Sequence, residues 1–215
     1  RKKYDRCRCH QQYLDSDKFT VELSEPTSTR QIVLNTSSDI LSEKTCASPF
    51  STQPISRISL TVFSYGLENR QILCLPPQFH NCDIKLEPYA YNLELAGQIL
   101  DDAGWKMGSG NVREKDGQQL NIDLLYNSDS VTEKSIAEYL QSEYQSIGVS
   151  LNIHGEEEQS YRDNMKAGNF DMVFNICWGT PYDPQSSLAA MRAPVYGDYA
   201  AQLGLDDKAE IDDAI

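Results

Sequence analysis

Two aromatic residues, Trp178 and Tyr182, stand four residues apart in the segment WGTPYDP, directly after the apolar run 170–176. Such a run is typical of a buried strand, and in open α/β sheets ligands bind beyond the carboxyl ends of the strands. Pro181 and Pro184 limit how far the segment can move, so little conformational entropy is left to lose on binding. The pair therefore suits a flat or chelate-like ligand, and an indole face also attracts a cation or stacks on an imidazole ring. The spacing fits equally well two rings that only cover the edge of the sheet.

Two more polar side chains follow this segment. Arg192 can pair with an anionic group of a ligand, or it can form an ion pair with a nearby carboxylate such as Asp183 or Asp198. Tyr196 can donate a hydrogen bond to a ligand, or it can be an ordinary surface aromatic residue. The sequence alone leaves both alternatives open.

The residue types that catalyse reactions have no suitable partners close in the sequence. Cys177 and Ser186 are the candidate nucleophiles, and neither has a histidine nearby. The chain also has no G-x-S-x-G motif and no Gly-rich phosphate loop after a strand. We therefore predict that the protein is not an enzyme and has no catalytic residues. Loss of an activity on alkylation of Cys177 would revive the hydrolase alternative.

Metal-ligating residues are also poorly placed for a metal centre. The motif CRCH at 7–10 has no second Cys/His cluster to complete a tetrahedral site, and His80 and His154 have no partner at ligand spacing. The three carboxylates at 156–158 stand where a helix begins, and there they complement the helix dipole. We predict no bound metal and no cofactor held by this chain's own side chains.

Composition excludes some classes of partner. The chain has 215 residues and a formal net charge of −13, and no basic stripe offsets that charge, so nucleic acid is an unfavourable partner. No apolar run approaches the ~20 residues that a membrane span requires. The segment 1–19 starts basic but lacks the apolar region of a signal peptide. The chain has no initiator Met and stops inside a predicted helix, so we expect a fragment of a longer protein.

From about residue 89 onward, helix and strand patterns alternate. Asn92 and Gly104 predict the start and the end of a helix over 93–103. A polar turn region at 108–119 precedes a predicted strand at 120–126. Ser130 and Glu133 form a capping-box pattern at the start of a helix that is predicted to reach residue 147.

The same alternation continues to the end of the chain. We predict a strand at 149–154, a helix within 155–168, a strand at 170–176 and a last helix from Asp206 or Asp207. Strands that alternate with helices over short connections indicate an α/β layer with a parallel sheet. Residues 1–88 are less regular: 19–26 and 30–39 each resemble one strand, and 44–75 shows no helical period.

Several segments together resemble a known family. LEPYAYNLELAGQILDDAGW, SIAEYLQSEYQSIGVSLNIHGEEE, GNFDMVFNICWGTPYDP and MRAPVYGDYAAQLGLDDKAEID are similar to the nickel-binding branch of the extracytoplasmic solute-binding proteins, family 5, of ABC importers. The similarity is close over 79–215 and fair over 13–39, and the W-G-x-P-Y-D-P run followed by M-R-x-P is its most specific part.

The resemblance implies a fold and a domain organisation. The expected architecture is α/β, a periplasmic-binding-protein-like lobe with a mostly parallel central sheet flanked by helices, forming part of a two-lobe clamp. Residues 1–33 are expected to be the end of the first lobe and the crossover strand, and 34–215 a second lobe that is truncated at its C-terminus.

The resemblance also implies a function. It suggests capture of nickel, as a chelate with histidine or another metallophore, in a cleft lined by Trp178, Tyr182, Tyr196 and Arg192. The nickel chelate is then a transported ligand, and an ABC permease is the expected protein partner. The implied location is periplasmic or extracellular, with lipid anchoring as one possible arrangement. The alternatives are a dipeptide- or oligopeptide-binding protein of the same family, or a fragment without function.

Two departures from the family pattern affect this implication. Where the family usually has a metal-contacting histidine this chain has Tyr196, and a neutral tyrosine is a poor nickel ligand compared with imidazole. The family tends to carry an aromatic residue at the position of Arg162, so the neighbouring Tyr161 is a weaker candidate for the cleft.

A further departure concerns residues 44–75, which keep the family's length but lose its helix pattern. Two compensating frameshifts would leave such a segment, and resequencing of the coding DNA tests this hypothesis.

Overall fold

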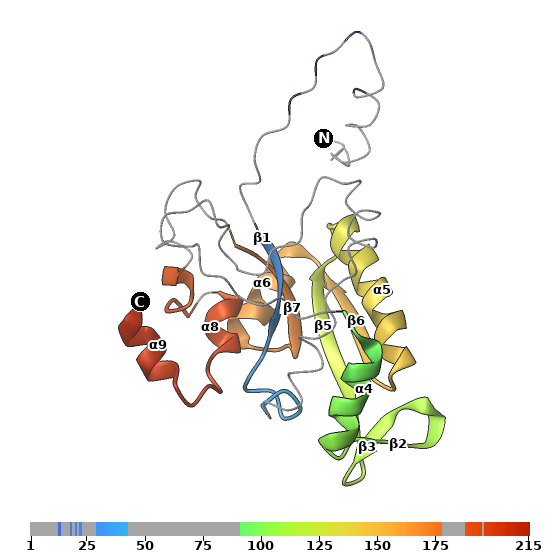
Figure 1. Cartoon of the computed structure of the whole chain (residues 1–215). Coiled ribbons are helices and arrows are strands. Elements are labelled where there is room, and N and C mark those ends of the chain that lie inside the picture. The colour runs from blue at the N-terminus through green and yellow to red at the C-terminus, as the bar shows by residue number, and fades with distance from the viewer. Residues whose placement is uncertain are drawn as a thin grey trace.

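The computed structural model describes residues 29–42, 91–177, 188–194 and 196–215, together with the single residues 13, 18, 20 and 22 (Figure 1). The strand expected at 19–26 and the irregular segment 44–75 therefore lie outside the described ranges. In the part of the chain that is described, no helix is both long enough and apolar enough to cross a bilayer.

Helices and strands alternate through most of the described residues, as the sequence predicts. In chain order the structure contains β1 (Thr29–Leu34), α4 (Leu93–Asp102), β2 (Lys106–Met107), the 3-10 turn η1 (Ser109–Asn111), β3 (Arg113–Lys115), β4 (Gln118–Gln119), β5 (Asn121–Asn127), α5 (Val131–Ser146), β6 (Ser150–Glu156), α6 (Glu158–Ala167), β7 (Met172–Cys177), α8 (Gly197–Ala201) and α9 (Lys208–Ala214).

The central sheet has four strands in the order β1-β7-β5-β6. Strand β5 pairs in parallel with both β6 and β7, whereas β1 pairs antiparallel with β7. The parallel pairs are connected through α5 and α6, because a return to the same end of a sheet requires a crossover. The prediction of a mostly parallel sheet flanked by helices is confirmed, and the antiparallel strand β1 is the addition that the alternation did not reveal.

Helices cover both faces of this sheet (Figure 1). On one face, α4 and α5 bury a large apolar cluster against β5, in which Leu100, Ile136 and Leu124 are almost inaccessible to solvent. On the other face, α6 and α8 cover a smaller cluster that includes Leu125 and Val173. Because side chains alternate along a strand, the neighbours Leu124 and Leu125 belong to the two different clusters.

The predicted helix boundaries hold because the local capping chemistry holds. The side chain of Asn92 accepts a hydrogen bond from the backbone N–H of Leu95 at 2.9 Å. Gly148 follows α5 at φ +83°, a left-handed conformation that favours glycine at a helix end. Trp105, which follows α4, is 5% exposed and belongs to the core cluster.

The expectation of a polar turn region at 108–119 is wrong. These residues contain β3 and β4, which form a three-stranded sheet with β2. Lys115 pairs with Gln118 across a two-residue turn, in which Asp116 and Gly117 have φ of +53° and +83°. The residue pair Asp-Gly favours a two-residue hairpin turn in which both φ angles are positive. This pair was visible in the sequence.

Two smaller differences concern the chain near the sheet. The strand expected at 30–39 ends at Leu34, and the following turn buries Ile40 and Leu41. The short helix α8 was not predicted, because five residues are too few for a helical period to be visible.

Candidate functional site

The carboxyl ends of the parallel strands meet at one edge of the sheet. Strand β5 ends there at Asn127, β6 at Glu156 and β7 at Cys177, while the antiparallel β1 begins there at Thr29, which pairs with Cys177. Helices α5 and α6 have their amino ends directly after β5 and β6. Ligands of open α/β proteins bind at such an edge.

The predicted ligand-binding residues are only partly within the described ranges. Trp178 and Tyr182 lie outside them, although Trp178 is bonded to Cys177 and so follows the carboxyl end of β7. Tyr196 is described: it is the N-cap residue of α8 and is 48% exposed. Arg192 is exposed. The structure therefore leaves these four assignments as predictions.

Asp198, one of the two carboxylates considered for Arg192, has other partners. Its Oδ1 accepts a hydrogen bond from Gln31 Nε2 at 2.7 Å, and its Oδ2 accepts one from Asn175 Nδ2 at 2.5 Å. The side-chain contacts of the Asp198 carboxylate are therefore with these two neutral amides and not with Arg192. Burial raises the pKa of Asp198 above its ordinary value, although the hydrogen bonds from the two amides act in the opposite direction.

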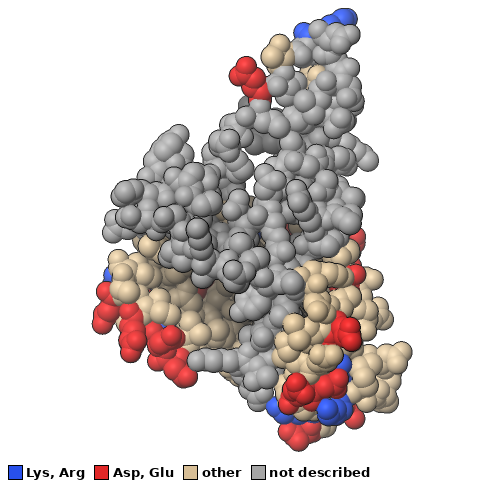
Figure 2. Space-filling view, in the orientation of Figure 1, with Lys and Arg blue, Asp and Glu red and all other residues tan. Residues whose placement is uncertain are grey.

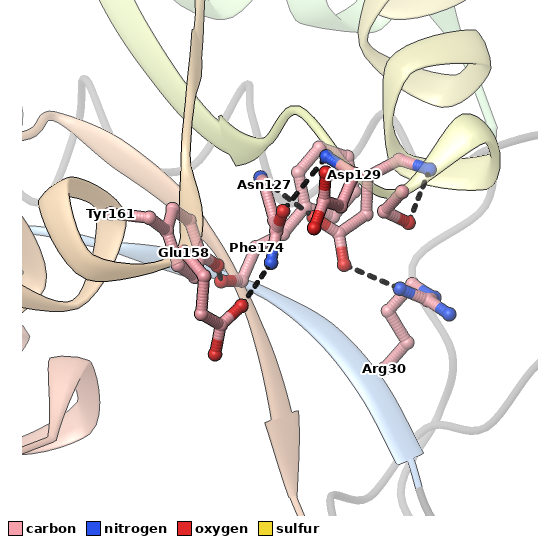
Figure 3. Close-up of polar contacts among 8 residues, drawn as sticks. Arg30, Asn127, Asp129, Glu158, Tyr161 and Phe174 are labelled. Atoms are coloured by element: carbon pink, nitrogen blue, oxygen red, sulfur yellow. Dashed lines mark hydrogen bonds and ion pairs between the residues drawn. The ribbon is translucent and has the colours of Figure 1, made fainter. Parts of the chain in front are cut away.

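An ion pair connects β1 to α5 on the opposite face of the sheet (Figure 3). Nη1 of Arg30 lies 2.5 Å from Oε1 of Glu133, and the two side chains are 24% and 5% exposed. Oε2 of Glu133 accepts a hydrogen bond from the backbone N–H of Asn127 at 3.0 Å. Burial raises the pKa of Glu133, although Asn127 and Arg30 act in the opposite direction. This carboxylate therefore ties together β1, the end of β5 and the start of α5.

The capping-box expectation is consequently only half right. The hydroxyl of Ser130 accepts a hydrogen bond from the backbone N–H of Glu133 at 3.3 Å, as expected for an N-cap residue. The Glu133 carboxylate accepts from Arg30 and from the backbone of Asn127, and the Ser130 N–H donates to the carbonyl of Asn127 at 2.9 Å. The partner that decided this geometry is 103 residues away in the sequence.

A second group of contacts lies at the start of α6. Oε2 of Glu158 accepts a hydrogen bond from the side chain of Asn127, and Oε1 accepts one from Arg162 Nε at 2.6 Å. Tyr161 is 8% exposed, and its hydroxyl donates to the backbone carbonyl of Phe174 (Figure 3). The Tyr161 side chain is therefore buried, and its hydroxyl is engaged by the backbone of β7.

The remaining carboxylates of the 156–158 run also have local partners. Glu157 is the N-cap residue of α6 and accepts from the backbone N–H of Ser160 at 3.1 Å, and Glu156 accepts from the hydroxyl of Ser160 at 2.7 Å. These contacts agree with a role at the helix amino end. Within the described residues, no group of three or more His, Cys, Asp and Glu side chains could hold a metal ion.

Acidic side chains are also prominent away from this edge. Figure 2 shows them along the α9 end of the molecule, where the exposed acidic residues are Asp206, Asp207, Glu210 and Asp213. Their exposure is consistent with a solvated surface of like charges.

Sequence reasoning missed Arg30, Gln31 and Asn175 at this edge. Arg30 and Gln31 could have been identified because these two polar residues directly precede the apolar residues IVL of the same predicted strand. Neighbouring residues of a strand point to opposite faces, so each of the pair meets a different layer of helices. No signal within the sequence connects Gln31 with Asp198, which are 167 residues apart.

The chain is similar to known proteins. A family model described as bacterial extracellular solute-binding proteins, family 5 Middle, matches residues 58–198. The nickel-binding periplasmic protein of Escherichia coli (strain K12) is 32% identical over 198 residues, which are 92% of this chain and 38% of that protein.

A solved structure and a peptide-binding relative extend the comparison. The crystal structure of NikA from Brucella suis in complex with Fe(III)-EDTA has 36% identity and a TM-score of 0.87, over 96% of this chain and 42% of that one. The oligopeptide-binding protein AppA of Bacillus subtilis (strain 168) is 29% identical over 90 residues, which are 41% of this chain and 17% of that protein. The chain thus spans about two fifths of the length of the first two proteins.

Proposed function

Because this chain belongs to the bacterial extracellular solute-binding proteins of family 5, we propose that it is part of the ligand-capturing component of an ABC importer. The proposed ligand is a nickel chelate, formed with histidine or another metallophore and bound in a cleft between two lobes. The observation that carries this proposal is the 32% identity to the nickel-binding periplasmic protein over 92% of the chain.

Features of the described residues support a binding role. The carboxyl edge of the sheet is held by the Arg30–Glu133 ion pair on one face and by the Asp198 hydrogen bonds on the other. A held edge loses little conformational freedom when a ligand binds, and preorganisation of this kind raises affinity. Trp178, Tyr182, Tyr196 and Arg192 remain the residues that we propose to contact the ligand.

Tyr196 affects whether the site binds free nickel or nickel that is already held by a chelator. A neutral phenol is a weaker nickel ligand than imidazole. We therefore propose that the metal is already chelated when it binds and that Tyr196 contributes a hydrogen bond to the chelator. The Brucella suis relative, whose structure holds Fe(III)-EDTA, is consistent with recognition of a whole chelate.

The other parts of the proposal follow from the family. The protein is inferred to act by binding and release, without catalysis and without a cofactor of its own. Its partners are the chelate and an ABC permease, and its location is periplasmic or extracellular, with lipid anchoring as a further proposal. Residues 1–33 are assigned to the end of the first lobe and the crossover, and 34–215 to the second lobe.

A peptide ligand is the second candidate. The 29% identity to an oligopeptide-binding protein over 90 residues favours it, and so does the loss of the histidine at Tyr196. A peptide backbone is recognised by hydrogen bonds and needs no imidazole.

The test is a titration of this chain with nickel(II), with and without L-histidine, followed by tryptophan fluorescence. We expect quenching only when both components are present, and we expect it to vanish in Trp178→Phe. The control is Trp105→Phe, because Trp105 is buried beside Lys115 in the core and should not report ligand.

Tyr196→His gives a second readout of the same proposal. Restoring an imidazole should raise the affinity for nickel about tenfold, whereas it should not help a peptide. A folded chain that binds a mixture of short peptides and shows no response to nickel would instead support the second candidate.

A further inference from the structure

Strand β1 is held on both faces near its start. Arg30 points to the α5 side and contacts Glu133, while Gln31 points to the α8 side and contacts Asp198. Gln31 also lies opposite Asn175 in the register of β1 and β7, so the two amides project from the same face of the sheet. They reach the two oxygens of a single carboxylate, at 2.7 and 2.5 Å.

The Asp198 carboxylate belongs to a short helix that carries a proposed ligand contact. Asp198 is the second residue of α8, and Tyr196 is the N-cap residue of the same helix. Gly197, between them, is buried, and a Cβ there would lie 3.4 Å from Met165 Sδ and 3.5 Å from Val173 Cγ1. The start of α8 is therefore packed closely against α6 and β7.

The other end of α8 is anchored separately. The backbone N–H of Thr36 donates to the carbonyl of Ala201 at 2.9 Å, and the N–H of Gly204 donates to the hydroxyl of Thr36 at 3.0 Å. These contacts fix the carboxyl end of the helix without Asp198. Asp198 adds polar contacts to this packing at the amino end, next to Tyr196.

We propose that Asp198 is a positioning residue for the binding site, because it bridges Gln31 and Asn175 and thereby fixes Tyr196 relative to the carboxyl end of β7. This inference rests on the proposed function, in which Tyr196 and the segment from Trp178 contact one ligand. Asn175 lies three residues before Trp178 in the sequence, so the bridge joins β7, near its carboxyl end, to the start of α8. Its loss should leave the fold intact and widen the range of positions that Tyr196 occupies.

The expected effect is local and measurable without any ligand. The backbone N–H of Ala200 donates to the carbonyl of Tyr196, so its hydrogen exchange reports how firmly the start of α8 is held. In Asp198→Ala we expect this amide to exchange at least about tenfold faster, with the Thr36 amide unchanged. Asp198→Asn should restore protection to within about threefold, because its carbonyl accepts from Gln31 and its amide donates to Asn175 after a flip of that side chain.

The matched control is Asp163→Ala. Asp163 is an exposed carboxylate of α6 whose partner, Gln159, is in the same helix. This variant should leave the exchange of the Ala200 amide unchanged. If Asp198→Ala does not fold, Gln31→Ala takes its place, since it removes one half of the bridge and leaves the carboxylate hydrogen-bonded to Asn175.

The second measurement is the affinity of the full 215-residue chain for nickel(II) with two equivalents of L-histidine, by calorimetry. We expect the Kd to rise about tenfold in Asp198→Ala, to stay near wild type in Asp198→Asn, and to be unchanged in Asp163→Ala. Unchanged Ala200 exchange in Asp198→Ala, or an unchanged Kd despite faster exchange, overturns the inference. A wild-type chain that binds no nickel–histidine contradicts the proposed function, whereas the exchange data still decide whether Asp198 holds Tyr196.

Discussion

The carboxylate of Glu133 is buried, where a negative charge is energetically unfavourable. Its side chain is 5% exposed, and desolvation outweighs the help that it receives from Arg30 and from the backbone of Asn127. Glu158 acts in the same direction as desolvation and also raises the pKa of Glu133. The residue therefore connects β1, β5 and α5 at the expense of some stability at neutral pH.

The pH dependence of stability tests this interpretation. The pKa of Glu133 is raised in the folded protein, so the folded state holds the proton more tightly than the unfolded state does. The contribution of Glu133 to the free energy of unfolding is then fully present below the ordinary glutamate pKa and is lost as the pH rises through the folded value. Relative to wild type, Glu133→Gln should therefore become more stable as the pH increases from about 4 to about 7.

Urea unfolding at each pH measures this difference in free energy. Glu138→Gln is the control, because Glu138 is an exposed residue of the same helix, paired with Lys134 at 3.9 Å. A difference between wild type and Glu133→Gln that does not change with pH would contradict the raised pKa.

At the scale of elements, the ends of α4 and α5 meet at Arg113 on β3. Nε of Arg113 donates to the carbonyl of Ile147 at 2.6 Å, and Nη1 donates to the carbonyl of Trp105 at 2.7 Å and to Asp101 at 2.8 Å. Carbonyls at helix carboxyl ends lack partners within the helix, so one buried guanidinium satisfies acceptors from two elements. The small sheet thereby closes one end of the main core.

Replacement of Arg113 should therefore destabilise the fold strongly. Arg113→Ala is expected to lower the free energy of unfolding by about 2–4 kcal/mol, because buried acceptors lose their donor. Arg113→Lys should recover less than about half of this loss, since an ammonium on a flexible stem does not reproduce the fork of donors. Chemical unfolding measures both, and Arg162→Ala, which removes an exposed contact within α6, should change stability by less than about 0.5 kcal/mol.

Gly117 and Gly148 have the same φ angle, so comparing them separates the cost of backbone strain from the cost of a steric clash. Gly148 and Gly117 both have φ of +83°, but a Cβ on Gly117 would meet nothing within 4 Å. A Cβ on Gly148 would lie 2.5 Å from Met107 Sδ and 2.9 Å from Arg113 Cγ. Met107 is exposed and can move, whereas Arg113 is held by its hydrogen bonds.

We expect Gly117→Ala to cost about 1 kcal/mol from the left-handed conformation alone, and Gly148→Ala to cost about 3 kcal/mol. Thermal or urea unfolding of the two variants gives the comparison. Adding Met107→Ala to Gly148→Ala should recover only part of the loss, and full recovery would show that Arg113 is not the obstacle.

At the scale of the whole molecule, β1 brings an early part of the chain into a sheet made otherwise of later residues. Thr29–Leu34 pairs with Met172–Cys177, so Thr29 and Cys177 lie side by side at the carboxyl edge (Figure 1). The chain therefore enters β1 and leaves β7 at the same edge of the sheet. This arrangement is consistent with the proposed crossover between two lobes.

Affinity tests the two-lobe proposal. The chain spans 38% of the length of the Escherichia coli nickel-binding protein, and closure of two lobes removes water from both sides of a ligand. We predict that the 215-residue chain alone binds nickel–histidine at least about 100-fold more weakly than that relative, which corresponds to several kcal/mol. Calorimetry on both proteins in one buffer measures the ratio, and submicromolar binding by this chain alone would contradict the prediction.

The sequence by itself determined the family, the fold class and most of the element boundaries. These features depend on local chemistry or on motifs: Asn92 and Gly148 act within one turn of their helices, and the apolar periods of α5 and β5 are visible in any short window. The resemblance that the WGTPYDP and MRAP segments indicated is confirmed by the match over residues 58–198. The Asp-Gly turn of β3 and β4 belongs with these local features, and it was overlooked.

Only the tertiary structure decided which polar groups meet at the carboxyl edge. Glu133 looked like a capping-box residue, yet its carboxylate bonds to Arg30, which lies 103 positions away. Asp198 looked like a partner for Arg192, yet it bonds to Gln31 and Asn175. The physical reason is that a buried carboxylate takes whichever donors the packed sheet brings within about 3 Å, and the register of β1 against β7 is set by long-range pairing.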